Sequence, residues 1–214
     1  MITLQLDIAQ TVGIAAVYAW VRQRQDVPTA RLFLLLALVQ PLVFGGAQYA
    51  NLDMLVAGMI TATLVLLAHS VFLLRNGGCY QTVLAWAYAF AGLGFLAKGL
   101  IGLVLPALAL LCWLTATRQL KWLPKLLLSV RGWLVLLALV VPWLWAMQQR
   151  YPDFFHYFFV VQHFDRFAKT GFNNMHPWWF YPTLLALFLL PFAYSLWRSI
   201  RAGSLNPATP HADM

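Results

Sequence analysis

Two single charges stand at the edges of long apolar runs, where either could take part in chemistry. Asp53 opens one such run, and Lys98 stands inside another with no acidic residue beside it in the sequence. Because a charge that faces lipid is costly, we expect both side chains to face a water-filled or protein-lined cavity. There the carboxylate of Asp53 could bind a metal or a hydroxyl or act as a general base, and the ammonium of Lys98 could bind a phosphate.

Each charge also has a purely structural interpretation. Asn51 or Asp53 could be the N-cap of the helix that follows, because either side chain can accept a backbone hydrogen bond there. Lys98 could extend to lipid headgroups, since its aliphatic part tolerates apolar surroundings near a helix end. The residue types leave both interpretations open, and for Asp53 the two are compatible.

Histidine and arginine form a second group of candidates within the long segment 149–177. His163 and Arg166 are three residues apart, so on a helix they share a face that could meet an anionic or sugar-bearing substrate. His156 and His163 are about 10.5 Å apart along a helix axis, so these two cannot bind one metal ion without further ligands. Contact with headgroups is the structural alternative for this group.

The aromatic run from His176 to Tyr181 reads HPWWFY. Such residues commonly anchor transmembrane helices at the interface. The same block could instead stack on a sugar or line a groove for a polyprenyl chain, so we count His176 and Tyr181 among the candidates for substrate binding. His69 lies inside an apolar run, where we expect it to form an interhelical hydrogen bond.

The composition places these residues in a membrane protein. Hydrophobic residues make up 62% of the 214 positions and charged residues 9%, whereas about a quarter of a typical soluble domain is charged. The net charge of +8 comes from Lys and Arg in short gaps between apolar runs, which fits the positive-inside rule and anionic lipid headgroups. No basic stripe on a soluble module is present, which argues against nucleic acid as a partner.

Apolar runs of about twenty residues predict an all-α, polytopic helix bundle with about seven transmembrane helices. Basic residues gather in alternate gaps, which places those gaps in the cytoplasm and the segment 149–177 on the outer side. In that segment, phenylalanines at helical spacing predict one amphipathic juxtamembrane helix in the interface. We expect a transmembrane domain over 1–200 and a disordered cytoplasmic tail over 201–214. The predicted spans are 3–21, 32–50, 54–74, 82–97, 99–117, 132–148 and 178–197.

Three segments, in this order, resemble the bacterial aminoarabinose transferase and protein O-mannosyltransferase family. The first is YANLDM at 49–54, with an acid that opens a helix. The second is GLGFLAKGLIGLVLP at 92–106, with a Lys-Gly between two apolar helices. The third, at 142–181, combines a Pro-Trp helix end, Pro-x-Phe, paired phenylalanines, His-x-x-Arg-Phe and the Pro-aromatic block.

The resemblance implies a GT-C fold and an enzyme of the bacterial inner membrane that is active on the periplasmic face. Such enzymes transfer a sugar from a polyprenyl-phosphate donor to lipid A, a protein or another glycan, and use no nucleotide sugar at the reacting site. By this resemblance, Asp53 corresponds to an acid of the active cavity and Lys98 to a lysine that meets the donor phosphate. His163 and Arg166 correspond to a pair at the cavity wall. Some members hold a divalent metal there, which makes His163 a candidate ligand.

The chain departs from the family in two respects. Family members carry their principal catalytic Asp, usually in an Asp-Glu pair, in the first outer loop, whereas this chain has no Glu and is expected to start after that loop. The large C-terminal soluble domain of several members is also missing. We therefore expect a fragment that is inactive alone. It would be a truncated gene product, half of a split enzyme for which a companion chain supplies the N-terminal part, or a sequence whose true start lies further upstream.

Two other functions fit parts of the sequence. A transporter or flippase would carry acids and bases at mid-depth and often an inverted repeat, whereas here the ionisable residues gather toward one face and no repeat is visible. A catalytically inactive membrane scaffold is compatible with every feature, because Asp53 and Lys98 could persist in it as relics. We predict the glycosyltransferase.

Overall fold

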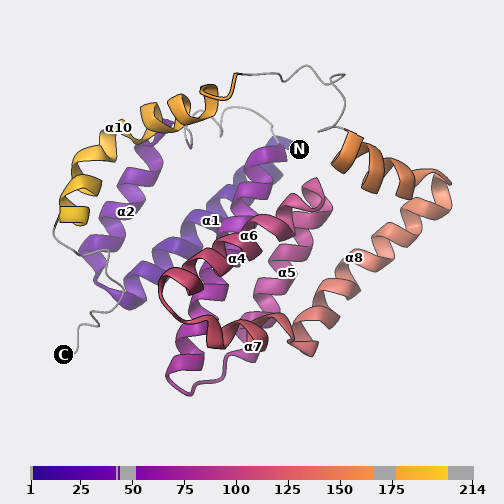
Figure 1. Ribbon diagram of the computed structural model, residues 1–214, viewed down its shortest axis with the longest axis horizontal. Coiled ribbons are helices and arrows are strands. Elements are labelled where there is room, and N and C mark those ends of the chain that lie inside the picture. The colour runs from indigo at the N-terminus through magenta and orange to yellow at the C-terminus, as the bar shows by residue number, and fades with distance from the viewer. Residues whose placement is uncertain (1, 42, 44–51, 166–176, 202–214) are drawn as a thin grey trace. The chain divides into compact units, whose positions relative to one another are not determined.

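The computed structural model describes residues 2–41, 43, 52–165 and 177–201, and among these residues there are helices and turns but no strand. The chain divides into two compact units, Met1–Ala168 and Lys169–Met214. Taken by itself, the first unit is a helix bundle, and the described part of the second holds one long helix (Figure 1). The prediction of an all-α protein is confirmed, whereas the domain bounds 1–200 and the tail 201–214 stay predictions.

Within residues 52–165 the helices follow one another with short connections. The second unit contains α10 (Phe180–Arg201). The first unit contains α1 (Ile2–Arg24), α2 (Val27–Val39), α4 (Leu52–Arg75), α5 (Gln81–Lys98), α6 (Ile101–Ala116), η1 (Leu120–Trp122), α7 (Leu123–Leu127), α8 (Val130–Arg150) and η2 (His156–Asp165).

Each predicted span overlaps one of these helices. Among the described residues, α4 and α8 are long and apolar enough to cross a membrane, while α2 and α6 are apolar but have only 13 and 16 residues. That about seven helices cross the membrane therefore stays a prediction.

The helix α2 begins five residues earlier than predicted, at Val27. The carboxylate of Asp26 accepts a hydrogen bond of 2.7 Å from the backbone N–H of Thr29 and so caps the helix. Pro28 follows in the first turn, where its fixed φ suits a helix start. The prediction missed this start because its signal is a capping residue and a proline and not an apolar pattern. The part of the predicted span from residue 44 on lies outside the described residues.

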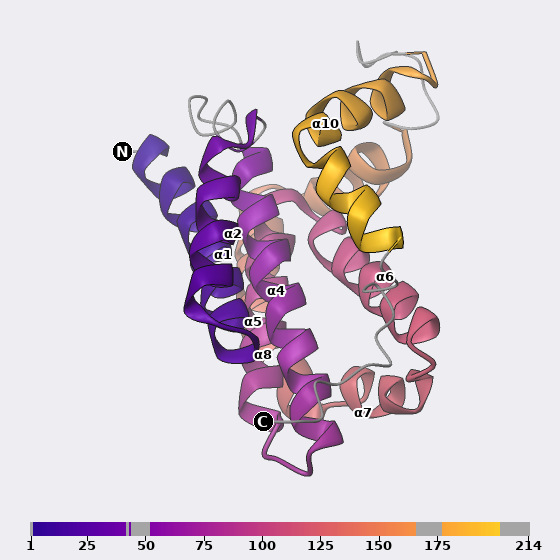
Figure 2. The same cartoon turned by 90° about the vertical axis from the view of Figure 1, so that its left-hand side faces the viewer.

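The helix α4 lies within the bundle and packs against α1, α5 and α6, while α5 packs in turn against α8 (Figures 1 and 2). Where α1 meets α4, a Cβ added to Gly13 would stand 3.1 Å from the Cα and the carbonyl oxygen of Gly58. Small residues at such a crossing let two helix backbones approach closely, as in helix association within lipid. A second contact of this kind, between α5 and α6, positions the site described below.

The buried core has two parts. One joins α4, α5, α6 and α7 around Leu84, Leu114 and Leu126, which are 0%, 0% and 1% exposed. The other joins α5 and α8 around Phe95 and Leu136. The helix α5 takes part in both and so links the two halves of the first unit.

The outer faces of the bundle are apolar as well. Trp86, Leu134 and Trp145 are 60%, 63% and 65% exposed, and only 17% of the apolar window of α8 is buried within the protein. A soluble protein would bury most of such a helix. The exposed apolar surface of α8 is therefore the surface that lipid would cover.

Candidate functional site at the paired ends of α4 and α5

Asp53 and Lys98 meet at one end of the bundle. The helices α4 and α5 are packed neighbours that run in opposite directions, so α4 begins beside the residue at which α5 ends (Figure 1). The Nζ of Lys98 forms an ion pair with the Oδ1 of Asp53, and the two side chains are 38% and 52% exposed. Lys98 has no acidic neighbour in the sequence, but the α4–α5 hairpin brings it together with an acid that is distant in the sequence.

The helix ends favour these charges where they stand. Asp53 is in the first turn of α4 and Lys98 in the last turn of α5. A helix carries partial positive charge at its N-terminus and partial negative charge at its C-terminus, so both side chains oppose the local charge. Asp53 itself has helical geometry, so it is not the N-cap, whose backbone is non-helical.

The ion pair is weak enough to be exchanged. Both side chains are more than a third exposed, and pairs at such exposure contribute only about 0–1 kcal/mol to stability. An anionic phosphate that reaches Lys98 can therefore take the place of Asp53. The ion pair keeps the ammonium of Lys98 in a defined position and still allows it to exchange Asp53 for another anion.

A tight glycine turn holds Lys98 at the tip of a helical hairpin. Only Gly99 and Leu100 separate α5 from α6, and Gly99 has a φ of 74°, a left-handed conformation that glycine adopts without strain. A Cβ added to Gly102 in α6 would stand 2.3 Å from the carbonyl carbon of Gly94 in α5. In the pattern G-x-x-x-K-G-x-x-G, Gly99 therefore allows the left-handed turn and Gly102 allows the close approach of α6 to α5. Together they determine where the ammonium of Lys98 lies.

The segment after α8 packs against the same end of α5. The chain turns at 151–153 and continues into the π-helix η2. The ring of Phe158 on η2 lies edge-on to Phe95, three residues before Lys98, with 5.6 Å between the ring centroids. Phe158 also stacks on Phe154 at 5.4 Å. Aromatic contacts of this kind stabilise a packing arrangement beyond the area they bury, so η2 is tied to the helix end that carries Lys98.

The predicted juxtamembrane helix has a helical counterpart in η2, and its amphipathic placement in the interface stays a prediction. The side chain of Phe154 is 9% exposed and that of Phe155 is 41% exposed, so neighbouring rings face in different directions. Phe167, which the prediction also placed on this helix, lies outside the described residues.

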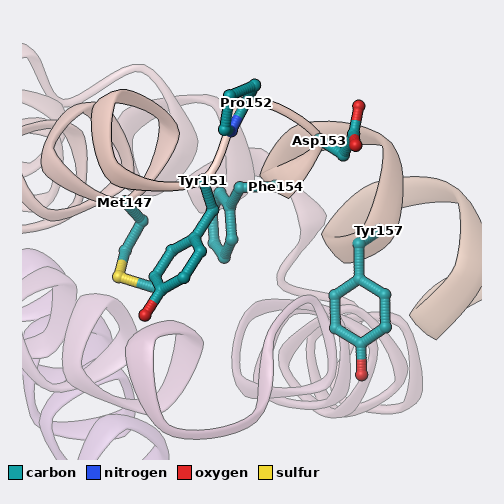
Figure 3. Close-up of a pocket in the computed structure, with 6 residues that line it drawn as sticks. All are labelled: Met147, Tyr151, Pro152, Asp153, Phe154 and Tyr157. Atoms are coloured by element: carbon teal, nitrogen blue, oxygen red, sulfur yellow. The ribbon is translucent and has the colours of Figure 1, made fainter.

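A cavity of about 490 Å³ opens where α8 turns into η2. Figure 3 shows the rings of Tyr151 and Tyr157 extending to one side of the turn and Asp153 to the other. Gln148 fixes the turn, because its side-chain oxygen accepts a hydrogen bond of 3.0 Å from the N–H of Phe155 and its amide donates to the carbonyl of Pro152. The sequence predictions missed this cavity. Its lining residues are Met147, Tyr151, Pro152, Asp153, Phe154 and Tyr157.

The other predicted site residues are not brought to the ion pair by the part of the chain that the structure describes. The backbone of His163 belongs to η2, while its side chain, Arg166 and His176 lie outside the described part. Tyr181 belongs to the second unit, where it is 61% exposed and its ring lies edge-on to Phe180 at 5.4 Å. Among the described residues, no three His, Cys, Asp or Glu side chains come together as a metal site.

His69 forms the predicted interhelical hydrogen bond. Its Nδ1 lies 3.3 Å from the Nη2 of Arg24 at the end of α1. The guanidinium of Arg24 also lies over the ring of Phe72, 3.0 Å from its centroid. These residues join α1 to the half of α4 that is distant from Asp53, so they belong to the packing of the bundle and not to the site.

Apolar outer faces, close glycine crossings and an ion pair at paired helix ends define a multi-helix integral membrane protein. Residues 2–145 match the sequence profile of the family described as dolichyl-phosphate-mannose-protein mannosyltransferase. The chain belongs to this family, and the predicted resemblance is confirmed. The matched segment contains both Asp53 and Lys98.

Individual relatives agree with this assignment. The undecaprenyl phosphate-alpha-4-amino-4-deoxy-L-arabinose arabinosyl transferase 1 of Sodalis glossinidius is 39% identical over 184 residues, which is 84% of this chain and 31% of the relative. The corresponding transferase of Pectobacterium atrosepticum is 32% identical over 190 residues, 88% of this chain and 33% of the relative. The chain therefore spans about a third of the length of these relatives.

The fold is similar to that of a solved structure. The crystal structure of ArnT from Cupriavidus metallidurans bound to undecaprenyl phosphate matches with a TM-score of 0.78 and 25% sequence identity. The match covers 94% of this chain and 37% of ArnT. This likeness confirms the predicted GT-C type of membrane fold.

Proposed function

We propose that this chain forms part of a membrane glycosyltransferase that moves a sugar from undecaprenyl phosphate to lipid A or another acceptor. The observation that carries the proposal is the ion pair of Asp53 and Lys98, held by a glycine hairpin inside the segment that matches the family. The names of the relatives support 4-amino-4-deoxy-L-arabinose as the sugar. The proposed location is the bacterial inner membrane, with about seven spans and the active face in the periplasm.

In the proposed reaction an acceptor oxygen attacks the anomeric carbon of the donor sugar. The bond from that carbon to the phosphate oxygen breaks, and the polyprenyl phosphate leaves with one more negative charge. A preformed cation at the place where this charge develops lowers the barrier, and Lys98 is the cation that the described part of the structure offers. Asp53 keeps the ammonium in place until the donor phosphate takes over as its partner.

The acceptor proton needs a base from outside this chain. Asp53 is already engaged with Lys98, so its proposed role is support. A companion chain or a preceding segment of the same protein would carry the principal acid. This division fits a chain that spans about a third of its relatives.

The cavity wall is proposed to come from η2 and the residues that follow it. The contact of Phe158 with Phe95 supports this, because it ties η2 to the end of α5. We assign His163 and Arg166 to the wall, with Arg166 sharing the phosphate charge, and His176 and Tyr181 to substrate contact. A divalent metal in the complete enzyme would take His163 as one of its ligands.

A chimaera tests the proposal. This chain would replace the matching segment of the Sodalis relative in bacteria that lack their own transferase, and aminoarabinose on lipid A would be measured by mass spectrometry. We expect transfer to be restored. Lys98→Ala should reduce transfer at least tenfold, whereas Arg75→Ala, which removes a cation from the other end of α4, should leave it unchanged.

Two alternatives remain as outcomes of this test. A chimaera that inserts normally but transfers no sugar, with a purified chain that fails to bind undecaprenyl phosphate, would indicate an inactive scaffold. Transport of a lipid-linked sugar without transfer would indicate a flippase. The position of the ion pair at helix ends, and not at mid-depth, favours transfer over transport.

A further inference from the structure

Four exposed basic residues surround the short helix α7, and we call this group the α7 basic surface. Its members are Arg118, Lys121, Lys125 and Arg131. Between positions 54 and 152 the sequence contains no Asp or Glu, so no acid from α5, α6, α7 or α8 can neutralise the group. The helix α7 lies across the end of the bundle at which the α4–α5 turn is also found (Figures 1 and 2).

Two of these basic residues form cation–π contacts with the ring of Trp122. The Nζ of Lys121 is 5.0 Å from the centroid of the Trp122 ring, and the Nζ of Lys125 is 5.2 Å from it. The ring face attracts each cation, which holds two like charges within reach of one ligand. Two ammonium groups with no neighbouring acid in this segment attract an anion with several oxygen atoms, such as a phosphate.

The α7 basic surface rests on a fixed support. The hydroxyl of Tyr88 on α5 donates to the carbonyls of Leu126 and Leu127 at 3.0 and 3.2 Å. The indole Nε1 of Trp133 on α8 donates to the carbonyl of Leu127 at 2.7 Å, and its ring lies edge-on to Tyr88 at 5.6 Å. These contacts satisfy carbonyls at the end of α7 and bind the helix to two others. The helix α7 is therefore held in place before a ligand binds, so binding does not have to order this surface.

Two of the arginines stand where the backbone does not favour them. Arg118 has a φ of 56°, and this left-handed conformation costs a non-glycine residue about 1–2 kcal/mol. At the equivalent helix end after α4, the residue in this conformation is Gly77, with a φ of 69°. Arg131 lies in the first turn of α8, where the helix dipole disfavours a cation. Both positions are unfavourable for an arginine, so we attribute Arg118 and Arg131 to a function and not to the stability of the fold.

An apolar rim completes the α7 basic surface. Leu120, Leu127, Leu128 and Val130 are 44%, 43%, 75% and 71% exposed. Leucines and valine beside lysines and tryptophan match the boundary between headgroups and acyl chains. A water-soluble phosphate compound would leave this rim in water, whereas a phospholipid covers it.

We propose that the α7 basic surface binds the headgroup phosphate of an anionic phospholipid, with Lys121 and Lys125 on the phosphate, Arg118 and Arg131 beside it, and the acyl chains against the apolar rim. The inference is independent of sugar transfer, because it concerns a different end of the bundle from Asp53 and Lys98. It gives the chain a lipid site at the end of the bundle where α7 ties α5 to α8.

The test uses the whole chain purified in a neutral detergent, with binding of phosphatidylglycerol and phosphatidylcholine followed by native mass spectrometry. We expect the wild-type chain to retain phosphatidylglycerol in preference. The variant K121Q/K125Q should bind it about ten- to thirty-fold more weakly, from the contribution of two basic residues near a lipid surface. The charge-conserving variant K121R/K125R should bind as the wild type does, which separates loss of charge from loss of folding.

The matched control is R22Q/R31Q, which removes two exposed charges from the α1–α2 region and should leave binding unchanged. Equal weakening by this control would overturn the proposal, since it would indicate general surface charge. Unchanged binding by K121Q/K125Q, or equal retention of phosphatidylcholine, would also overturn it. Displacement of the lipid by millimolar glycerol phosphate would show that a free phosphate compound suffices and would refute the lipid assignment.

Discussion

Gly94 of α5 and Gly102 of α6 stand in backbone contact. A Cβ on Gly102 would lie 2.3 Å from the carbonyl carbon and 2.6 Å from the carbonyl oxygen of Gly94. Real side chains do not reach such distances, so the two helices can cross here only because position 102 is glycine; a Cβ on Gly94 would meet its nearest atom, the Cα of Gly102, at 3.4 Å. Lys98 lies between the two glycines in sequence, at the tip of the hairpin that they close.

Gly102→Ala should therefore destabilise the protein by about 1–3 kcal/mol, as overpacking of a closed contact does. The control is Gly92→Ala in α5, where an added Cβ would meet side-chain carbons of Leu136, Leu139 and Val140 at 3.7 Å, an ordinary contact. This control should be neutral or stabilising by up to about 1 kcal/mol. Thermal unfolding in detergent measures both, and equal melting temperatures for the two variants would contradict the prediction.

Lys98 should determine binding of the donor phosphate by its charge. Lys98→Gln should weaken binding of undecaprenyl phosphate to the purified chain by about tenfold or more, because a hydrogen bond to a charged group contributes about 1.5–3 kcal/mol. Lys98→Arg keeps the charge and should retain most of the affinity. Asp53→Asn removes the competing carboxylate and should raise the affinity up to about fivefold, from a pair worth at most about 1 kcal/mol.

Calorimetric titration in detergent measures these affinities. A Lys98→Gln variant that binds undecaprenyl phosphate as tightly as the wild type would exclude the phosphate role of Lys98. An Asp53→Asn variant with unchanged affinity but a lower melting temperature would show that the pair serves stability alone.

The start of α2 should lose stability in acid. Hydrogen bonds from the hydroxyl and then the backbone N–H of Thr29 lower the pKa of Asp26 below its usual value. The stability from this cap is therefore complete above the unfolded pKa of about 3.9, and it is lost as the pH falls through the lower folded pKa. Asp26→Asn keeps a capping side chain without the titration, so its melting temperature should depend less on pH between 5 and 2.5, a range set roughly by that pKa. Parallel curves for variant and wild type would refute this.

Arg118 and Gly77 occupy equivalent positions after two helices and should respond in opposite directions to substitution. Arg118→Gly relieves a left-handed arginine and should stabilise the chain in plain detergent by about 1 kcal/mol. Gly77→Ala should destabilise it by a similar amount, although no atom lies within 4 Å of the added Cβ, because only the backbone conformation opposes it. Melting temperatures that fall for both variants would contradict this account of Arg118.

The order and type of the elements could be predicted from the sequence because apolar runs of the right length are a strong local signal. Every predicted span overlaps a helix. The early start of α2 was missed because its signal is a capping residue and a proline, Asp26 and Pro28, and not an apolar pattern. No periodicity in the sequence predicts the π-helical geometry of η2 or the stacking of Phe158 on Phe154.

The candidate site was predicted as separate residues and not as an arrangement. Asp53 and Lys98 were both identified from the cost of a charge in an apolar run, but their pairing depends on the α4–α5 hairpin, a tertiary feature. The sequence presents the glycines around Lys98 only as part of a family signature, whereas the structure shows that Gly102 lets α5 and α6 cross closely. The anchoring of α7 by Tyr88 and Trp133 could not be predicted, since its acceptors are backbone carbonyls.

The two-residue connection between α5 and α6 also limits how the chain can be made. Gly99 and Leu100 span at most about 7 Å, whereas the hydrocarbon core of a bilayer is about 30 Å thick. In the proposed topology, α5 cannot span the bilayer while α6 is still in the cytoplasm, because the connection between them is too short to cross the hydrocarbon core. The insertion machinery must hold both helices until synthesis of α6 is complete and release them as one unit, with Lys98 carried across at its tip.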